Sequence, residues 1–329
     1  MRQVVLGRSG LRVSELCLGT MTFGTEWGFG TDEATSAEIY GAFREAGGNF
    51  LDTANNYTEG VSEEIVGRLI AKERDSLVVA TKFSLPLVRG DLNSGGSHRK
   101  SLRRSIEASL RRLGTDHVDL LWVHAWDRAT PVDETMKALD DLVTTGKVLS
   151  IGVSNTPAWA IARSQTLAEL RGWTPYCALQ VEYSLARRDP ERELLPMAEE
   201  LGLVVTAWSP LAMGLLTGKF TSGAAQADSK RAVSKRPLTD RENVITQAID
   251  AVARDIDESP ARVAIAWLRA RGVIPVLGAR TTTQIEDNLG ATHISLNADA
   301  RSRLDDASAV ELGYPHDFLN ERADFLDAP

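Results

Sequence analysis

The chain alternates short apolar runs with helix-like segments, and this alternation limits the possible folds more than any other feature. Each run has the length of a buried strand, and the segment after it has the apolar spacing of a helix. The runs occupy residues 15–20, 49–52, 77–83, 118–124, 148–153, 178–182, 203–208 and 273–277. Eight strand–helix units at nearly uniform spacing predict an α/β fold of the (β/α)8 TIM-barrel type, with an N-terminal β-hairpin over residues 4–13 and extra helices.

No shift in composition divides the chain, so we expect residues 1–329 to form a single domain. A doubly wound dinucleotide fold is the structural alternative, but no Gly-x-Gly-x-x-Gly follows the first strand. One long interruption, residues 214–238, is rich in Gly, Ala and Ser and carries two basic pairs at 230–231 and 235–236. Loops of this length inside a compact domain are usually functional or disordered. The tail beyond Gly313 has no clear period.

Composition excludes several classes of function. The formal net charge of −8 argues against nucleic acid as the main partner. No apolar run is long enough to span a bilayer, and the start of the chain lacks a signal-peptide core, so we expect a cytoplasmic protein without a membrane partner. Neither the two cysteines nor the five histidines have a metal-ligand spacing, so we expect no metal.

Polar and aromatic side chains gather where the predicted strands end. In a barrel of this type the carboxyl ends of the strands face the active site. Taken singly, each side chain has an ordinary structural explanation, such as a turn cap, a buried ion pair or a core imidazole. Their occurrence at adjacent strand ends is not explained in this way. The positions are Asp52, Tyr57, Lys82, His124, Ser154, Asn155, Gln180, Trp208 and Ser209.

Four of these side chains form a chemically sensible set. A tyrosine hydroxyl has an ordinary pKa near 10, too high for ready proton exchange at neutral pH. An ammonium at Lys82 would lower the pKa of Tyr57, and a carboxylate at Asp52 would hold that ammonium in place. His124 would orient a carbonyl oxygen beside the tyrosine. The set predicts a proton-delivery site for a developing alkoxide.

These residues belong to longer motifs, which resemble the aldo-keto reductase family. The resemblance extends from the N-terminal hairpin to about residue 291, and the bacterial members similar to potassium-channel β-subunits are nearest in character. The motifs occur in family order at compatible spacing: Leu51-Asp52-Thr53-Ala54-Asn55-Asn56-Tyr57, Thr81-Lys82-Phe83, His124 with Asp127, Gly152-Val153-Ser154-Asn155, Gln180-Val181-Glu182-Tyr183-Ser184, Trp208-Ser209-Pro210-Leu211, and Gly278-Ala279-Arg280 with Asp287-Asn288-Leu289.

The resemblance implies an NADPH-dependent reductase in which Asp52, Tyr57, Lys82 and His124 are catalytic, with Tyr57 as the general acid. It implies that Trp208 stacks on the nicotinamide, although the family usually has Tyr there, and that Arg280 binds the 2′-phosphate, for which a guanidinium is suited. An ordinary capped helix start is the alternative for the segment after Arg280. The complete implied NADPH/NADP+ set is Gly19, Thr20, Ser154, Asn155, Gln180, Trp208, Ser209, Pro210, Leu211, Gly214, Gly278, Arg280, Gln284, Asp287 and Asn288.

The expected partner is a small-molecule carbonyl or alcohol substrate. Loops 23–30, 85–96 and 125–130 are expected to shape its pocket, with Trp27, Phe83 and Trp126 as apolar candidates, each of which could instead pack away from substrate. Two other functions remain open. One is a barrel enzyme that forms a Schiff base on Lys82, which would require an uncharged lysine. The other is a non-catalytic NADPH-holding regulatory subunit.

Overall fold

A closed barrel of parallel strands forms the centre of the computed structural model, which describes residues 1–88, 90–219 and 237–323. The strands follow one another around the barrel in the order β10-β3-β4-β5-β6-β7-β8-β9, so the predicted (β/α)8 fold is confirmed. Their bounds are β3 Cys17–Gly19, β4 Phe50–Asp52, β5 Val78–Phe83, β6 Val118–Val123, β7 Val148–Ser154, β8 Tyr176–Glu182, β9 Val204–Trp208 and β10 Ile274–Leu277.

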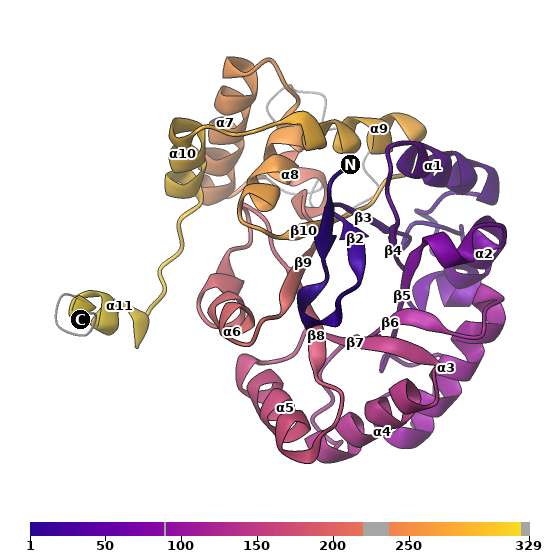
Figure 1. Cartoon of the computed structure of the whole chain (residues 1–329). Coiled ribbons are helices and arrows are strands. Elements are labelled where there is room, and N and C mark those ends of the chain that lie inside the picture. Colours follow the sequence, from indigo (N-terminus) through magenta and orange to yellow (C-terminus); the bar gives the residue numbers. More distant parts are fainter. Residues whose placement is uncertain (89, 220–236, 324–329) are drawn as a thin grey trace.

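Helices surround the barrel, as Figure 1 shows. They cover the outward faces of the strands, since parallel strands require crossover connections on the outside of a barrel. In the described ranges they are α1 Glu33–Glu45, α2 Val61–Ile70, α3 Arg99–Leu113, α4 Val132–Thr144, α5 Ala158–Arg171, α6 Leu194–Glu200, α7 Asp240–Asp255, α8 Pro260–Ala270, α9 Thr282–Gly290 and α10 Ala298–Ser308. A further helix, α11 His316–Asn320, lies apart from the barrel in Figure 1.

The predicted N-terminal hairpin is present and closes one end of the barrel. Strand β1 (Gln3–Val5) pairs antiparallel with β2 (Arg12–Ser14), and Figure 1 shows the hairpin across the barrel mouth. The side chains of Leu6 and Val13 are completely buried against the barrel interior, in one cluster with Phe50 and Trp122. Because this end is plugged, a ligand must approach the barrel from the opposite, carboxyl end of the strands.

Alternation along the strands divides the core into two layers. Inward residues such as Phe50, Ala80 and Trp122 fill the barrel, whereas their neighbours face the helices in a larger outer cluster. Gly152 lies beside the Trp122 ring so closely that a Cβ atom at residue 152 would overlap ring carbons. The lack of a side chain at Gly152 therefore lets a tryptophan fill the interior.

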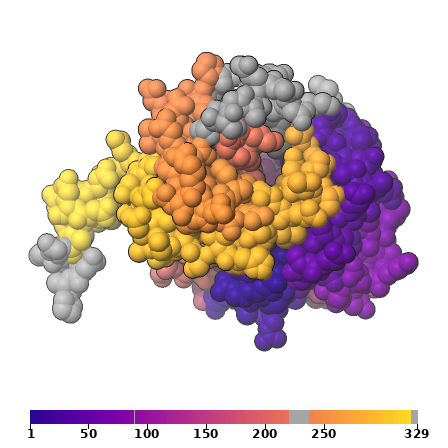
Figure 2. Space-filling view, turned by 90° about the horizontal axis from the view of Figure 1, so that it is seen from above, coloured from indigo at the N-terminus to yellow at the C-terminus, as the bar shows by residue number. Residues whose placement is uncertain are grey.

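Several features differ from the expectations or lie outside them. The predicted tail without a period contains the short helix α11, which Figure 2 shows projecting from the body. The structure also has α10 after the last barrel unit. Both basic pairs of the long loop lie outside the described residues. In the described part of the chain every helix is too short or too polar to cross a membrane.

Candidate active site

The inward positions at the carboxyl ends of the strands hold the side chains that the sequence singled out. Alternation places Asp52, Lys82, Ser154, Gln180 and Trp208 on the inward face of their strands, because each has an adjacent strand residue in the outer layer. The strands form a closed ring, so side chains from distant strands can meet inside it. Gln180 on β8, for example, forms a hydrogen bond with Asp52 on β4.

Lys82 and Asp52 form a buried ion pair at the base of the site. The Lys82 ammonium donates to Asp52 Oδ2 and, at 2.8 Å, to the backbone carbonyl of Thr53. The two side chains are 0% and 3% exposed. Burial by itself lowers the pKa of Lys82, but the Asp52 carboxylate and the Tyr57 hydroxyl outweigh it, so the pKa of Lys82 lies above its ordinary value. The lysine therefore stays charged.

Tyr57 reaches the site from η2 (Tyr57–Gly60), the turn that follows β4 and precedes α2. Lys82 Nζ lies 4.8 Å from the centroid of the Tyr57 ring. The expectation of a net lowered pKa is wrong: burial raises the pKa of Tyr57 above its ordinary value, and the ammonium of Lys82 opposes this only in part. Lys82 thus makes the hydroxyl more acidic than burial alone would leave it.

His124 follows β6 and contacts Tyr57. The two rings meet edge to face, with centroids 5.9 Å apart and planes at 81°. The backbone N–H of His124 donates to the carbonyl of Phe83 at 2.9 Å, which fixes the residue beside β5. Burial, together with the Lys82 charge, lowers the pKa of His124 to about 3. The imidazole is therefore neutral at physiological pH, and its Nδ1 has no partner among the described residues.

The residues expected to hold a nicotinamide lie on the next three strands. Ser154 is fully buried, and its Oγ lacks a hydrogen-bond partner among the described residues, as does Nε1 of Trp208. Asn155 donates to the carbonyl of His124 at 2.8 Å, and Gln180 donates to Asp52 Oδ1 at 3.2 Å. Unpaired buried polar atoms are costly, so Ser154 and Trp208 fit a site whose ligand completes their hydrogen bonds.

The residues expected to contact the phosphates and the adenosine lie in two segments, the turn after β9 and the segment after β10. After β9, Ser209 and Gly214 have φ of 55° and 95°, around Pro210 and Leu211, in the turn that leads through η5 (Ala212–Thr217). Gly278 follows β10, and the backbone N–H of Arg280 donates to Gln284 Oε1 at 2.8 Å at the start of α9.

The side chains of Arg280, just before α9, and of Asp287 and Asn288, on α9, differ in whether they already have partners within the protein. Arg280 is partly buried, and its guanidinium makes no ion pair with the described residues. Asn288 is buried, and its amide lies 3.5 Å from the carbonyl of Gly278. Asp287 is already occupied by Arg262, at 2.9 Å, and by the hydroxyl of Ser259. Its contacts therefore support the fold of this segment.

Gly19 and Thr20 sit where β3 ends. A Cβ atom at residue 19 would come within 2.7 Å of the Val276 side chain, so glycine allows β3 and β10 to approach. Thr20 donates from its backbone N–H to the carbonyl of Asp52 at 2.9 Å. Both residues therefore fix the strand end beside the ion pair.

The three apolar pocket candidates do not share one environment. Trp27 is partly buried, and its ring lies 6.2 Å from that of Tyr57. Trp126 packs edge to face on Trp159, with centroids 5.7 Å apart. Phe83 is 0% exposed in the outer layer, since it alternates with the inward Lys82. The expectation that Phe83 contacts substrate is therefore wrong.

Sequence reasoning missed several residues that support the site. Thr53 accepts from Lys82 through its backbone, which no side-chain motif reveals. Trp159, at the start of α5, is 61% exposed and continues the aromatic surface of Trp126. The buried Glu63 and the partly buried Arg112 form an ion pair next to the tyrosine turn, 49 residues apart in the chain. In the described ranges no three potential metal ligands gather.

Comparison with known proteins agrees with this geometry. The model of the aldo/keto reductase family matches residues 15–309. Norsolorinic acid reductase of Aspergillus flavus is 37% identical over 331 residues, covering 97% of this chain and 84% of the relative. The uncharacterized oxidoreductase YrpG of Bacillus subtilis is 40% identical, covering 93% and 95%. The NADP+-type aryl-alcohol dehydrogenase of Phanerodontia chrysosporium is 34% identical, covering 98% and 90%. The chain is therefore an oxidoreductase that belongs to the aldo/keto reductase family.

Proposed function

We propose that the protein is an NADPH-dependent carbonyl reductase that converts an aldehyde or ketone to an alcohol. The observation that carries the proposal is the meeting of Tyr57, the charged pair of Lys82 and Asp52, and the neutral ring of His124 at the open end of the barrel. Family membership supports carbonyl reduction in general. The substrate, the cofactor type and the residue roles are the proposed part.

Tyr57 acts as the general acid in this proposal. Its hydroxyl gives a proton to the carbonyl oxygen as negative charge develops there. Lys82, kept charged by Asp52, stabilises the phenolate that remains. His124 stays neutral, so it can direct a ring N–H at the carbonyl oxygen without adding a charge. The positioned acid contributes roughly 10² to 10⁴-fold in rate.

The chain has residues suited to hold NADPH. Ser154, with its unpartnered buried hydroxyl, together with Asn155 and Gln180, would bind the carboxamide, and Trp208 would stack on the ring. Arg280 would hold the 2′-phosphate, and the turn at 209–214 would face the remaining phosphates. When bound, the nicotinamide would supply a hydride to the carbonyl carbon.

A Schiff-base mechanism on Lys82 has less support. A lysine nucleophile must be neutral, and its pKa is usually lowered for that purpose. The pKa of Lys82 is raised instead, and its ammonium is already shared between Asp52 and Thr53. No observation specifically favours the non-catalytic NADPH-holding subunit, and the four polar groups would have no task in it.

Aromatic carbonyl compounds are the proposed first substrates. Trp27 and Phe29, with ring centroids 5.9 Å apart, lie on one side of Tyr57, and Trp126 with Trp159 follows His124. Aromatic side chains suit aromatic ligands through stacked and edge-to-face contacts. The name of one relative, an aryl-alcohol dehydrogenase, supports the same class.

A spectrophotometric screen of NADPH oxidation tests the proposal. It should cover aryl and alkyl aldehydes, ketones, quinones and sugar carbonyls, with the Tyr57→Phe variant as the matched blank. We expect aryl aldehydes to be reduced by the wild type and hardly at all by the variant. If no carbonyl compound oxidises NADPH above the rate of the variant, the proposed function is wrong.

A further inference from the structure

The turn that carries Tyr57 has a backbone conformation that residues other than glycine rarely adopt. After Tyr57, Thr58, Glu59 and Gly60 have φ of 44°, 60° and 101° in succession. The left-handed region is unfavourable for residues other than glycine. Surrounding contacts must therefore keep the turn in this shape, and with it the position of the Tyr57 hydroxyl.

Glu63 links this region to the strand of the active-site lysine. It lies on α2, and its side chain is fully buried although it is a carboxylate. Its Oε1 accepts from the hydroxyl of Thr81 at 2.5 Å, and Thr81 is the outward neighbour of Lys82 on β5. Its Oε2 accepts from Nε of Arg112 on α3 at 2.8 Å and forms an ion pair with Nη2 of the same arginine at 2.6 Å. Glu63 thus connects α2, α3 and β5.

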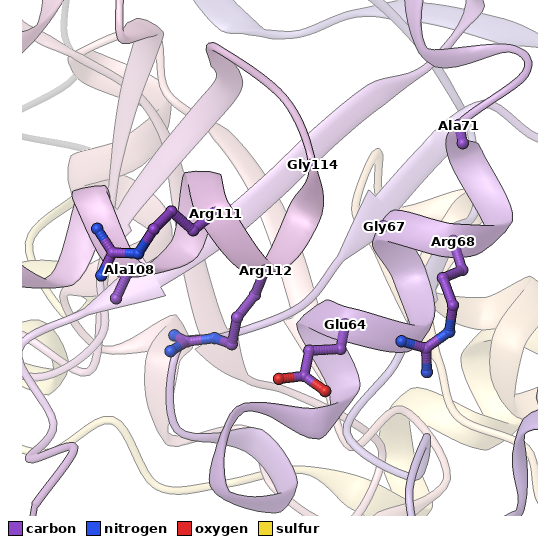
Figure 3. A pocket seen from close by; sticks show the side chains of 8 residues that line it. All are labelled: Glu64, Gly67, Arg68, Ala71, Ala108, Arg111, Arg112 and Gly114. Carbon is purple, nitrogen blue, oxygen red and sulfur yellow. The ribbon is translucent and has the colours of Figure 1, made fainter.

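Arg112 extends the connection to the tyrosine turn. Its Nη2 also donates to the carbonyl of Asn55 at 3.3 Å, two residues before Tyr57. A Cβ atom at Gly60 would lie 3.0 Å from Arg112 Nε, so the arginine also packs on the end of the turn. A groove of about 510 Å³ lies between α2 and α3, and Arg111 and Arg112 line it together with Glu64 and Arg68. Figure 3 shows these side chains.

We propose that Glu63 and Arg112 are positioning residues that hold the Tyr57 turn at a fixed place relative to Lys82. They act from outside the barrel: Arg112 holds the turn through Asn55, and Glu63 holds both Arg112 and the strand of Lys82. The kinetic part of this inference rests on the proposed reductase activity, whereas the position of Tyr57 can be measured without turnover.

Loosening the turn should change the pKa of Tyr57 in one direction. The titratable groups facing its hydroxyl are Lys82 on β5, Asp52 on β4, His124 after β6 and Cys17 on β3. Burial raises the pKa of Tyr57 more than Lys82 lowers it. A turn released toward water loses both effects, so the pKa of Tyr57 falls toward its ordinary value of about 10.

The experiment compares neighbouring residues on the same two helices. Glu63→Gln and Arg112→Met remove the pair, while Glu64→Gln and Arg111→Met change exposed residues next to them. The chain has five tyrosines, so 13C-labelled tyrosine can be titrated by NMR, with Tyr57 assigned by its loss in Tyr57→Phe. Single-turnover reduction of an aryl aldehyde, NADPH dissociation constants and thermal unfolding are measured on the same variants.

We expect both pair variants to fold, to bind NADPH within about twofold of wild type, and to lose roughly 10- to 100-fold in single-turnover rate, as a displaced catalytic group does. The pKa of Tyr57 falls in both, and the double variant loses no more than the worse single variant, because the two residues act as one unit. The two controls match the wild type.

Two results would overturn the inference: a Tyr57 titration and rate equal to those of the controls, or a rate loss explained wholly by weaker NADPH binding. If Glu63→Gln does not fold, Arg112→Lys decides, because an ammonium cannot keep the planar two-point contact with Glu63. It should show the same changes at smaller size. A wild type that reduces no carbonyl compound refutes the proposed function alone, since the tyrosine titration still tests the pair.

Discussion

The ammonium of Lys82 lies 4.8 Å from the centre of the Tyr57 ring and is held from below by Asp52 and by the carbonyl of Thr53. This arrangement joins strand β4, the turn after it and strand β5, which follows α2 in the chain. Burial disfavours the phenolate and raises the pKa of Tyr57, and the ammonium is the neighbouring group that opposes this effect in part. Several predictions of the proposed mechanism depend on this geometry.

Removing the Tyr57 hydroxyl should abolish most turnover without loosening the cofactor. We expect Tyr57→Phe to lower carbonyl reduction by roughly 10² to 10⁴-fold, the usual contribution of a positioned acid, while the NADPH dissociation constant stays nearly unchanged. Tyr40→Phe is the matched control, since the Tyr40 hydroxyl donates to Glu73 on the outside of the barrel. Turnover at the wild-type level in Tyr57→Phe would remove Tyr57 from its role.

Removing Lys82 should cost stability as well as activity. Lys82→Met leaves Asp52 as a buried carboxylate without its cation, which typically costs about 3–5 kcal/mol of unfolding free energy. The double variant Asp52→Asn with Lys82→Met should recover part of this loss, because no charge is left buried. Urea unfolding measures both.

The control for this pair is Lys147→Met, which breaks a surface ion pair with Glu107 whose side chains are 39% and 40% exposed. Exposed pairs are worth about 1 kcal/mol or less. Equal losses of unfolding free energy in Lys82→Met and Lys147→Met would mean that the buried pair stabilises the fold no more than a surface pair does.

Much of the fold could be predicted from the sequence because a single repeating pattern, a strand followed by a helix, determines it. Apolar runs separated by helical segments specify the barrel, and alternation then assigns inward and outward residues. The same rule, applied to Thr81-Lys82-Phe83, would have shown that an inward Lys82 turns Phe83 to the outer layer. The start of α1 shows the limit of such patterns: the sequence suggests Thr31 as the cap, but Asp32 is the cap and accepts from the N–H of Thr35.

The remaining parts of the site depend on contacts that no local pattern encodes. The φ values of Thr58 and Glu59 follow from packing around the turn, and ordinary residues at these positions give no signal. The pairing of Glu63 with Arg112 joins two helices, and Glu64 and Arg111 look equivalent to them in the sequence. The net direction of the Tyr57 pKa depends on how deeply the ring is buried, which the sequence does not give.

Arg280 should discriminate between the two nicotinamide cofactors. Hydrogen bonds to a charged group contribute about 1.5–3 kcal/mol, so we expect Arg280→Ala to weaken NADPH binding roughly 10- to 100-fold. NADH lacks the 2′-phosphate and should bind the variant about as well as it binds the wild type. Fluorescence titration with both cofactors measures this, with Arg301→Ala on exposed α10 as the control. Equal weakening of NADPH and NADH would contradict phosphate recognition.

His124 should make the protein less stable as the pH falls. Its pKa is about 3 in the folded protein and about 6.5 in an unfolded chain, so the unfolded state binds more protons between these values. The free energy of unfolding therefore keeps the full His124 contribution above pH 6.5 and loses up to about 1.4 kcal/mol per pH unit below it. His124→Gln should flatten this part of the stability curve, whereas His293→Gln, at an exposed position, should leave it unchanged. Urea unfolding at several pH values from 7 down to about 4 measures the difference. A constant difference between wild type and His124→Gln across that range would mean that the imidazole is not kept neutral by the fold.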